Sequence, residues 1–191
     1  MQSKLRMKAF VTDLLKNKLP STYYYHDYAH TMYVMHKAVE IAHHEKCTEE
    51  EIELLITAAL WHDTGFIHVY DNHEEEGCAL AKKYLPEYGY SNDEIDKICG
   101  MIMATKIPQS PKNKLEEIIA DADLEYLGTT SASEKANDLF KERQHLNPAL
   151  TREQWKQIEI SFLQKHHYFT EYCKENTAPG KAAYLISLSV A

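Results

Sequence analysis

The segment Thr57–Gly65, which reads TAALWHDTG, joins an apolar helical run to an adjacent imidazole and carboxylate. The apolar part predicts the end of a buried helix, and Gly65 is placed to terminate it. A buried helix rarely carries a histidine and an aspartate in its last turn unless a cation gathers them. His62 and Asp63 therefore predict a metal site built on helices.

The length and charge of the chain restrict its class and its partners. Its 191 residues suit one domain that buries a core without disulfides. The formal net charge is −8, with Lys and Arg scattered along the chain, which disfavours nucleic acid and anionic membranes as partners and suits a cation. The sequence has no run of about 18 apolar residues that would span a membrane.

The cysteines and the N-terminal segment bear on the compartment. Four cysteines lie far apart without a C-x-x-C pair, which argues against a zinc ribbon or a redox dithiol and favours a reducing compartment. The first 15 residues show neither a long apolar core nor a cleavage-like site, so they do not resemble a signal peptide. We therefore expect a cytoplasmic protein.

Apolar residues recur at three- and four-residue steps along most of the chain, which is the spacing of helices with one buried face. Alternating strand patterns are missing, so the predicted fold class is all-α, with one domain over residues 1–191. Residues 128–150 are the least regular and are interpreted as a lid or an insertion. Residues 151–191 are expected to pack on the core as a C-terminal helix, broken by Pro179-Gly180 before a short tail. The expected helices cover residues 3–18, 27–45, 48–62, 74–84, 91–102, 115–127 and about 155–172.

Three histidines on the expected helix 27–45 differ in their surroundings. His30 falls on the side of the buried arc, whereas His36 and His44 fall on the polar arc and are expected to face water. A single inward histidine is more often a hydrogen-bonded core residue than a ligand. Its position alone therefore leaves both interpretations of His30 open.

Two aspartates, Asp121 and Asp123, interrupt the apolar run 118–124. A buried carboxylate is costly unless it is paired or bound to metal, although an aspartate near a helix end is usually a cap or solvated. With the inward histidine and the HD dipeptide, they supply nitrogen and oxygen ligands that suit Mn, Fe, Co, Ni or Zn. Mg fits less well because imidazole is a poor ligand for it. Four protein ligands on a six-coordinate ion leave two positions for water and substrate.

The pattern formed by His30, His62-Asp63 and Asp123 resembles the H…HD…D signature of the HD superfamily of metal-dependent phosphohydrolases. The resemblance implies an HD-type helical bundle with these four residues as metal ligands. In that family the final aspartate commonly precedes a Leu-Gly pair by a few residues, which favours Asp123. Asp121 stays the alternative, either as the ligand or as an acceptor for a ligating histidine.

The segment Tyr25–His30, which reads YHDYAH, is similar to the YHNxxH stretch of cyclic-nucleotide phosphodiesterases, with Asp27 where that group has Asn. There the second histidine binds metal and the first donates a proton to the leaving group. The resemblance therefore implies that His26 is a general acid and His30 a ligand. It covers about residues 25–128, which form the expected motif core.

Members of the superfamily with two metals, including the HD-GYP cyclic-dinucleotide enzymes, have further histidines between the HD dipeptide and the last aspartate. His73 matches one of them and is a candidate ligand of a second ion, although His68 and His73 are equally compatible with loop positions near the mouth of the site. Residues 103–106 have no histidine where another would stand, so one ion, or one strong and one weak site, is expected. Lys106 is either a solvated lysine or a point charge that holds a phosphate oxygen.

The predicted function is hydrolysis of a phosphomonoester or phosphodiester of a nucleotide or another small phosphorylated metabolite by metal-activated water. Asp63 would orient or deprotonate the water, and His26 would protonate the departing oxygen. Two other functions stay open, namely an HD-type di-iron oxygenase that cleaves C–C or C–P bonds with O₂ and a non-catalytic HD regulatory domain. The partner is a small phosphorylated substrate, which the sequence does not name, and a homo-oligomer is an open alternative.

Overall fold

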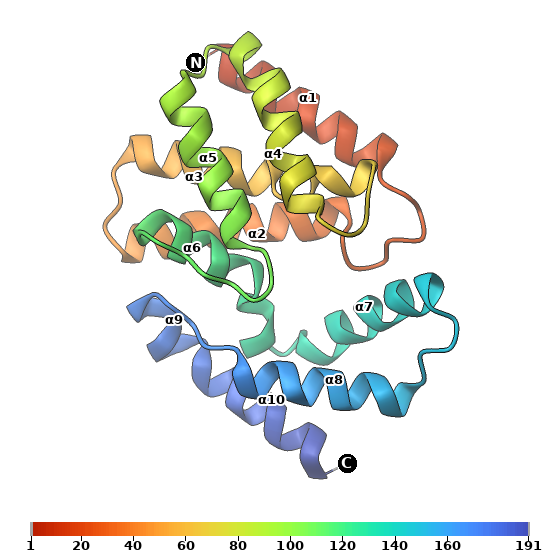
Figure 1. Cartoon of the computed structure of the whole chain (residues 1–191). Helices are drawn as coiled ribbons and strands as arrows, with labels where there is room; N and C mark the ends of the chain where they lie inside the picture. Colours follow the sequence, from red (N-terminus) through yellow and green to blue (C-terminus); the bar gives the residue numbers. More distant parts are fainter. Residues whose placement is uncertain (1, 191) are drawn as a thin grey trace.

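The computed structural model describes residues 2–190, and all the regular secondary structure in this range is helical (Figure 1). The prediction of an all-α domain is therefore confirmed. The α-helices are α1 (Gln2–Lys18), α2 (Tyr28–His44), α3 (Glu49–Trp61), α4 (His73–Tyr84), α5 (Asn92–Ala104), α6 (Lys114–Asp123), α7 (Ala132–Leu146), α8 (Arg152–Lys165), α9 (Glu171–Asn176) and α10 (Ala178–Val190). Short 3₁₀ helices follow α3, α4 and α6, namely η1 (Thr64–Ile67), η2 (Leu85–Tyr88) and η3 (Glu125–Gly128).

The central helix is α3, which contacts α1, α2, α5 and α6. Its start is set by a capping box in which Thr48 and Glu51 exchange side-chain and backbone bonds. Its buried face ends in Trp61, whose indole N–H lies 3.3 Å from the sulfur of Met7 on α1. The apolar face of α3 is thus the surface on which neighbouring helices pack. Because α3 is buried, His62 at its end lies in the interior of the protein.

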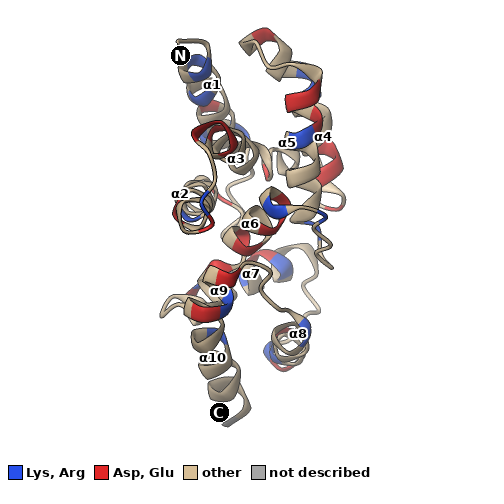
Figure 2. Ribbon diagram, turned by 90° about the vertical axis from the view of Figure 1, so that its left-hand side faces the viewer, with Lys and Arg blue, Asp and Glu red and all other residues tan. Residues whose placement is uncertain are grey.

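The helices form two layers, which we call the core layer (α1–α6) and the cover layer (α7–α10) (Figure 1). The N-terminus lies at the outer end of the core layer and the C-terminus at the outer end of the cover layer. Figure 2 shows basic segments interspersed with acidic ones on helices of both layers, consistent with scattered Lys and Arg. Within residues 2–190, none of the helices combines the length and apolar character that crossing a membrane requires.

Five details of the sequence prediction were wrong. Residues 128–150 are not irregular, because α7 occupies most of them. The helix expected over 115–127 ends at Asp123 and is followed by η3. The long last helix is three helices, since α8 ends at Lys165. Pro179 lies in the first turn of α10, where a missing N–H leaves no helical bond unmade, so it begins a helix rather than breaking one.

The fifth detail concerns Gly65, which was expected to cap α3. The helix ends at Trp61, and Gly65 lies within η1. A Cβ atom at this position would lie 1.9 Å from the backbone oxygen of His73. Glycine is therefore required for the close approach of α4 to η1, not for helix termination.

Candidate metal centre

Three side chains far apart in the sequence meet where α2, α3 and α6 converge. They are His30 in the first turn of α2, His62 after the last turn of α3 and Asp123 at the end of α6, and one ligand atom of each lies within 4.8 Å of the others. His30 Nε2 is 3.1 Å from Asp123 Oδ1, and His62 Nε2 is 3.6 Å from the same oxygen. Both histidines are almost fully buried.

Asp63 completes the cluster, because its Oδ2 lies 3.2 Å from His62 Nε2 and 3.5 Å from His30 Nε2. Adjacent helical side chains diverge by about 100°. His62 still has helical backbone angles, but Asp63 has φ −98° and ψ 3°, where the chain turns from α3 into η1. This change of direction lets the side chains of His62 and Asp63 approach each other, which the sequence predicted for the end of a helix.

The cluster contains two buried polar atoms without a hydrogen-bond partner, namely His62 Nε2 and Asp63 Oδ2. His62 Nδ1 is 2.7 Å from the carbonyl oxygen of Ala59, so Nδ1–H donates there and Nε2 is left facing the carboxylates. Buried polar atoms nearly always have partners. These two atoms fit a bound cation that both contact.

The electrostatics of the cluster favour positive charge at its centre. Burial raises the pKa of Asp63 and Asp123, but the neighbouring imidazoles of His62 and His30 outweigh burial and hold both pKa values well below the ordinary range. Burial lowers the pKa of His62, yet Asp63 and Asp123 raise it well above its ordinary value. A divalent cation provides the same compensation as these protons, with nitrogen and oxygen donors that suit transition metals.

Asp121, the alternative ligand, lies outside this cluster. Its fully buried carboxylate accepts hydrogen bonds from Phe169 N at 2.9 Å, Thr170 N at 2.8 Å and Thr170 Oγ1 at 2.7 Å. None of these donors belongs to His30 or His62, so the interpretation of Asp121 as an acceptor for a ligating histidine was wrong. Its role is to hold the segment before α9 against α6.

His26, the candidate general acid, is held by Glu142 of α7. Glu142 Oε1 is 2.5 Å from His26 Nδ1, and Glu142 Oε2 accepts from the backbone N–H groups of Tyr25 and His26 at 3.0 and 3.1 Å. Tyr70 also donates to Glu142, at 3.0 Å. Burial lowers the pKa of His26, but the bond with Glu142 and the charge of Asp63 outweigh it, and the net pKa is raised.

The sequence did not indicate Glu142. A glutamate on a helix with many charged residues is usually solvated, and its 117-residue separation from Tyr25 leaves no local pattern. In the structure it is fully buried.

The remaining candidates are His73, Lys106 and His68, and His73 lies beside the cluster. His73 Nε2 is 3.8 Å from Asp63 Oδ1 and 3.5 Å from Glu74 Oε1, with its ring stacked on Phe66. Lys106 Nζ donates to Asn72 at 3.1 Å and to the carboxylate of Glu75. His68 is exposed and 2.6 Å from Glu76, so it takes no part.

A cavity of about 750 Å³, the catalytic cavity, opens from the cluster toward the cover layer. Its polar end contains Asp63, His26 and Asp123, with Lys106 and Arg143 among the basic residues in its walls. The rest of the lining combines apolar side chains, among them Leu127, Leu139, Trp155 and Phe162, with the polar side chains of Asn147 and Glu159. The cavity suits a molecule with a charged and an apolar part.

An all-α bundle with a His/His/Asp cluster at the ends of three helices defines a candidate divalent-metal protein. A family model described as HD domain matches residues 27–125, slightly more than half of the chain. The chain therefore belongs to the HD domain family, which indicates a metal-dependent phosphohydrolase at the level of the superfamily. The matched range contains all four proposed ligands but begins after His26.

Two solved structures resemble the whole chain. One is a predicted HD superfamily hydrolase from an uncultured Thermotogales bacterium, at 22% identity and TM-score 0.64, covering 97% of this chain and 89% of that one. The other is Bacillus subtilis YpgQ in complex with ADP, at 16% identity and TM-score 0.67, covering 99% of this chain and 94% of that one. At these identities the likeness concerns the fold. No curated protein sequence matches the chain.

Proposed function

We propose that this protein hydrolyses a phosphomonoester or phosphodiester of a nucleotide or another small phosphorylated metabolite. The proposed ligands of its metal are His30, His62, Asp63 and Asp123. The observation that carries the proposal is the pair of buried, unpartnered atoms, His62 Nε2 and Asp63 Oδ2, inside a cluster of imidazoles and carboxylates. Such atoms are costly unless a cation completes them.

The donor set favours Mn, Fe, Co, Ni or Zn over Mg, because two of the four groups are imidazoles. A divalent ion held by these residues would supply Lewis-acid chemistry toward a phosphoryl oxygen and would activate water.

The surrounding side chains have separate proposed roles. The carboxylate of Asp63 lines the catalytic cavity and is the acceptor available to orient or deprotonate an attacking water. His26 lines the same cavity, and its raised pKa suits a group that protonates a departing oxygen near neutral pH. Lys106 is proposed to attract a phosphate oxygen at the rim, in exchange for its contact with Glu75.

A nucleotide is the favoured substrate class for two reasons. The cavity volume of about 750 Å³ and its combination of charged and apolar side chains suit a phosphate joined to a ring system. One of the structural neighbours was solved with ADP.

His73 is proposed to contribute to a second, weaker ion site. Its Nε2 lies near Asp63 Oδ1 and Glu74 Oε1, so a carboxylate shared by two ions is sterically reasonable. Residues 103–106 contain no histidine that would strengthen such a site.

The test compares His62→Ala with His36→Ala, an exposed histidine of α2 that serves as the control. Elemental analysis should find metal in the wild type and the control, and little in His62→Ala. A panel of phosphomonoesters and phosphodiesters, assayed with several divalent ions, should show activity lost together with the metal. The proposal is wrong if His62→Ala keeps both metal and turnover.

A further inference from the structure

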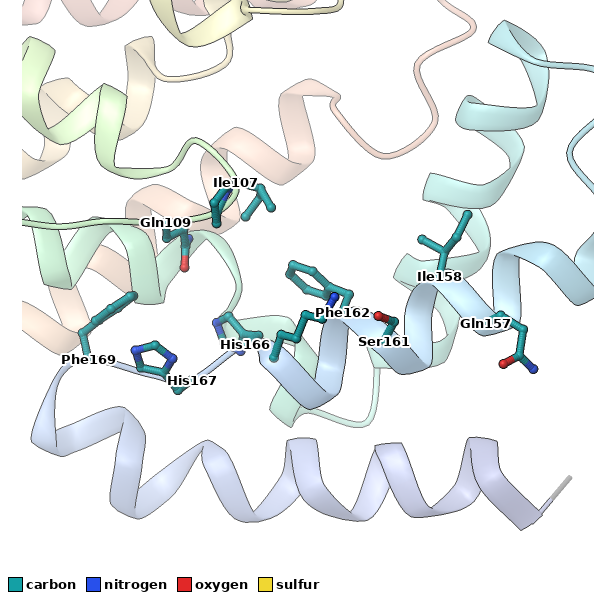
Figure 3. A pocket seen from close by; sticks show the side chains of 11 residues that line it. Ile107, Gln109, Gln157, Ile158, Ser161, Phe162, His166, His167 and Phe169 are labelled. Carbon is teal, nitrogen blue, oxygen red and sulfur yellow. The ribbon is translucent and has the colours of Figure 1, made fainter.

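A second cavity, of about 530 Å³, lies between the loop that carries Ile107 and Gln109, the helix α8 and the segment after that helix (Figure 3). Its wall is largely apolar, and its one lysine, Lys165, is exposed. An exposed ionic contact contributes little binding energy, so this cavity does not select a class of ligand. A more specific feature lies in the core layer, where two thiols meet.

Cys78 of α4 and Cys99 of α5 face each other across a helical hairpin. The two helices are joined by η2 and lie side by side (Figure 1). Cys78 Sγ lies 3.4 Å from the carbonyl oxygen of Cys99, and Cys99 Sγ lies 3.7 Å from the carbonyl oxygen of Cys78. Each sulfur thus reaches the backbone of the other residue, so the two backbones approach closely here. A disulfide needs such an approach, with Cα atoms about 4.4–6.8 Å apart, and bridging this pair therefore requires side-chain rotation rather than movement of the helices.

The two thiols differ in acidity. The Cys78 thiol donates a hydrogen bond that lowers the pKa of Cys99, and the charge of Lys82 acts in the same direction against burial. The same contact, together with burial, raises the pKa of Cys78 well above its usual value. The thiolate is the nucleophilic form of cysteine. Cys99 is therefore the attacking sulfur, and Cys78 is the partner that keeps its proton.

The four free cysteines also differ in access to a small oxidant. Cys99 is 8% exposed and Cys78 is partly exposed. Cys173 is fully buried, and burial raises the pKa of Cys47. The hairpin pair thus combines a reachable, more acidic thiol with a second thiol in contact with it, which is the arrangement of a redox-sensitive pair.

We propose that Cys78 and Cys99 are a redox-active pair that hydrogen peroxide converts to an intramolecular disulfide. The Cys99 thiolate attacks one peroxide oxygen, the O–O bond breaks, and the other oxygen takes up a proton and leaves as water, so that Cys99 becomes a sulfenic acid. The Cys78 sulfur then attacks the Cys99 sulfur, the S–O bond breaks, and the hydroxyl leaves as water with the Cys78 proton. In total, two thiols lose two electrons and two protons, and one peroxide becomes two waters.

The bridge would crosslink two walls of the catalytic cavity. The helix α4 begins at His73 and α5 is followed by Lys106, and both of these residues line that cavity. Gly77, next to Cys78, packs so closely on the end of α3 that a Cβ atom there would lie 3.2 Å from the carbonyl oxygen of His62. The disulfide therefore fixes α4 beside the metal centre without using a proposed ligand. The thiol pair depends on neither the metal nor the proposed hydrolysis.

Peptide mapping after oxidation tests the pair. The reduced protein is treated with hydrogen peroxide, the remaining thiols are alkylated, and the protein is digested without reductant. The expected product is a linked pair of peptides containing Cys78 and Cys99, with Cys47 and Cys173 alkylated. The bridge should raise Tm by about 5 °C because it restricts the unfolded chain, and dithiothreitol should reverse the shift. The control variant Cys47→Ser should form the same linked peptides.

Single variants test which sulfur attacks. In Cys78→Ser the sulfenic acid on Cys99 lacks its partner and should be trapped by dimedone, whereas Cys99→Ser should give about tenfold less label at Cys78. Circular dichroism verifies that both variants fold, and Cys99→Ala replaces Cys99→Ser if the latter does not. The proposal is overturned if the linked peptides do not form or if Cys47 is bridged instead. Stronger labelling of Cys78 than of Cys99 would overturn the assignment of the attacking sulfur, and a lower Tm after bridging would contradict a bridge that leaves the helices in place.

Discussion

The core layer and the cover layer each contain one fully buried carboxylate that accepts hydrogen bonds from the other layer. Asp121 of α6 accepts three hydrogen bonds from residues 169 and 170 of the cover layer, and Glu142 of α7 accepts bonds from residues 25, 26 and 70 of the core layer. Both side chains have no exposed surface. Geometrically, the two contacts are therefore alike.

Their electrostatics differ. Asp121 meets only neutral donors, so burial prevails and raises its pKa. Burial also opposes the charge on Glu142, but His26 can carry a compensating proton, and the pKa of Glu142 is lowered. Although both carboxylates are equally buried, Asp121 has a structural role and Glu142 is a charged partner for His26, the candidate proton donor. The two aspartates of α6 differ in the same way, because the pKa of Asp121 is raised by burial and that of Asp123 is lowered by the neighbouring histidines.

The largest expected effect is that of Asp123→Ala. Removing a metal ligand should lower phosphohydrolase activity by about 100-fold or more, because losing even an outer partner of a ligand typically costs 10- to 100-fold. Metal content should fall with it. Retention of wild-type metal content would show that Asp123 is not a ligand.

Asp121→Ala should have the opposite effect, with lower stability and unchanged metal content. Loss of the carboxylate leaves three donors at residues 169 and 170 without their partner, which should destabilise the fold by about 3 kcal/mol and lower Tm by about 10 °C. Thermal unfolding measures the effect, and elemental analysis of the folded variant should find metal at the wild-type level. If metal is lost while Tm stays constant, the roles assigned to the two aspartates are exchanged.

Glu142→Gln should keep the fold and reduce kcat by about 10- to 30-fold, since an uncharged partner holds the proton on His26 less strongly. The pKa of His26 is raised in the native protein, so its proton-donating form persists to higher pH than for an ordinary histidine. The variant should therefore lose activity at a lower alkaline pH than the wild type. Glu134→Gln, at an exposed position on α7, is the matched control and should leave the pH profile unchanged.

The smallest effect is expected for Lys106→Gln. The lysine is partly exposed and paired with Glu75, so an exposed ionic contact with substrate should change KM by about 2- to 5-fold and leave kcat almost constant. Lys112→Gln in the same loop provides a control away from the cavity. A large fall in kcat would instead place Lys106 at the reacting phosphate.

Local patterns predicted most helices of the core layer, because their apolar faces and caps are contiguous in sequence. The capping boxes at Thr48 and Ser91 and the inward position of His30 all follow from such patterns. The cover layer was predicted less well. Its helices contain many charged residues, and α7 has a buried face made partly of small alanines, which gives a weak periodic signal.

By itself, the sequence determined that the fold is helical and that His30, the HD dipeptide and the two aspartates of residues 121–123 are unusual polar groups on apolar helices. The pattern of these groups resembles that of metal-dependent hydrolases. Only the tertiary structure decided between Asp121 and Asp123 as a neighbour of the histidines, revealed Glu142 behind His26 and formed the two cavities. The physical reason is the sequence separation over which each kind of interaction acts. Periodicity and capping act within a few turns of one helix, whereas the surroundings of a buried carboxylate are set by residues 48 to 117 positions away.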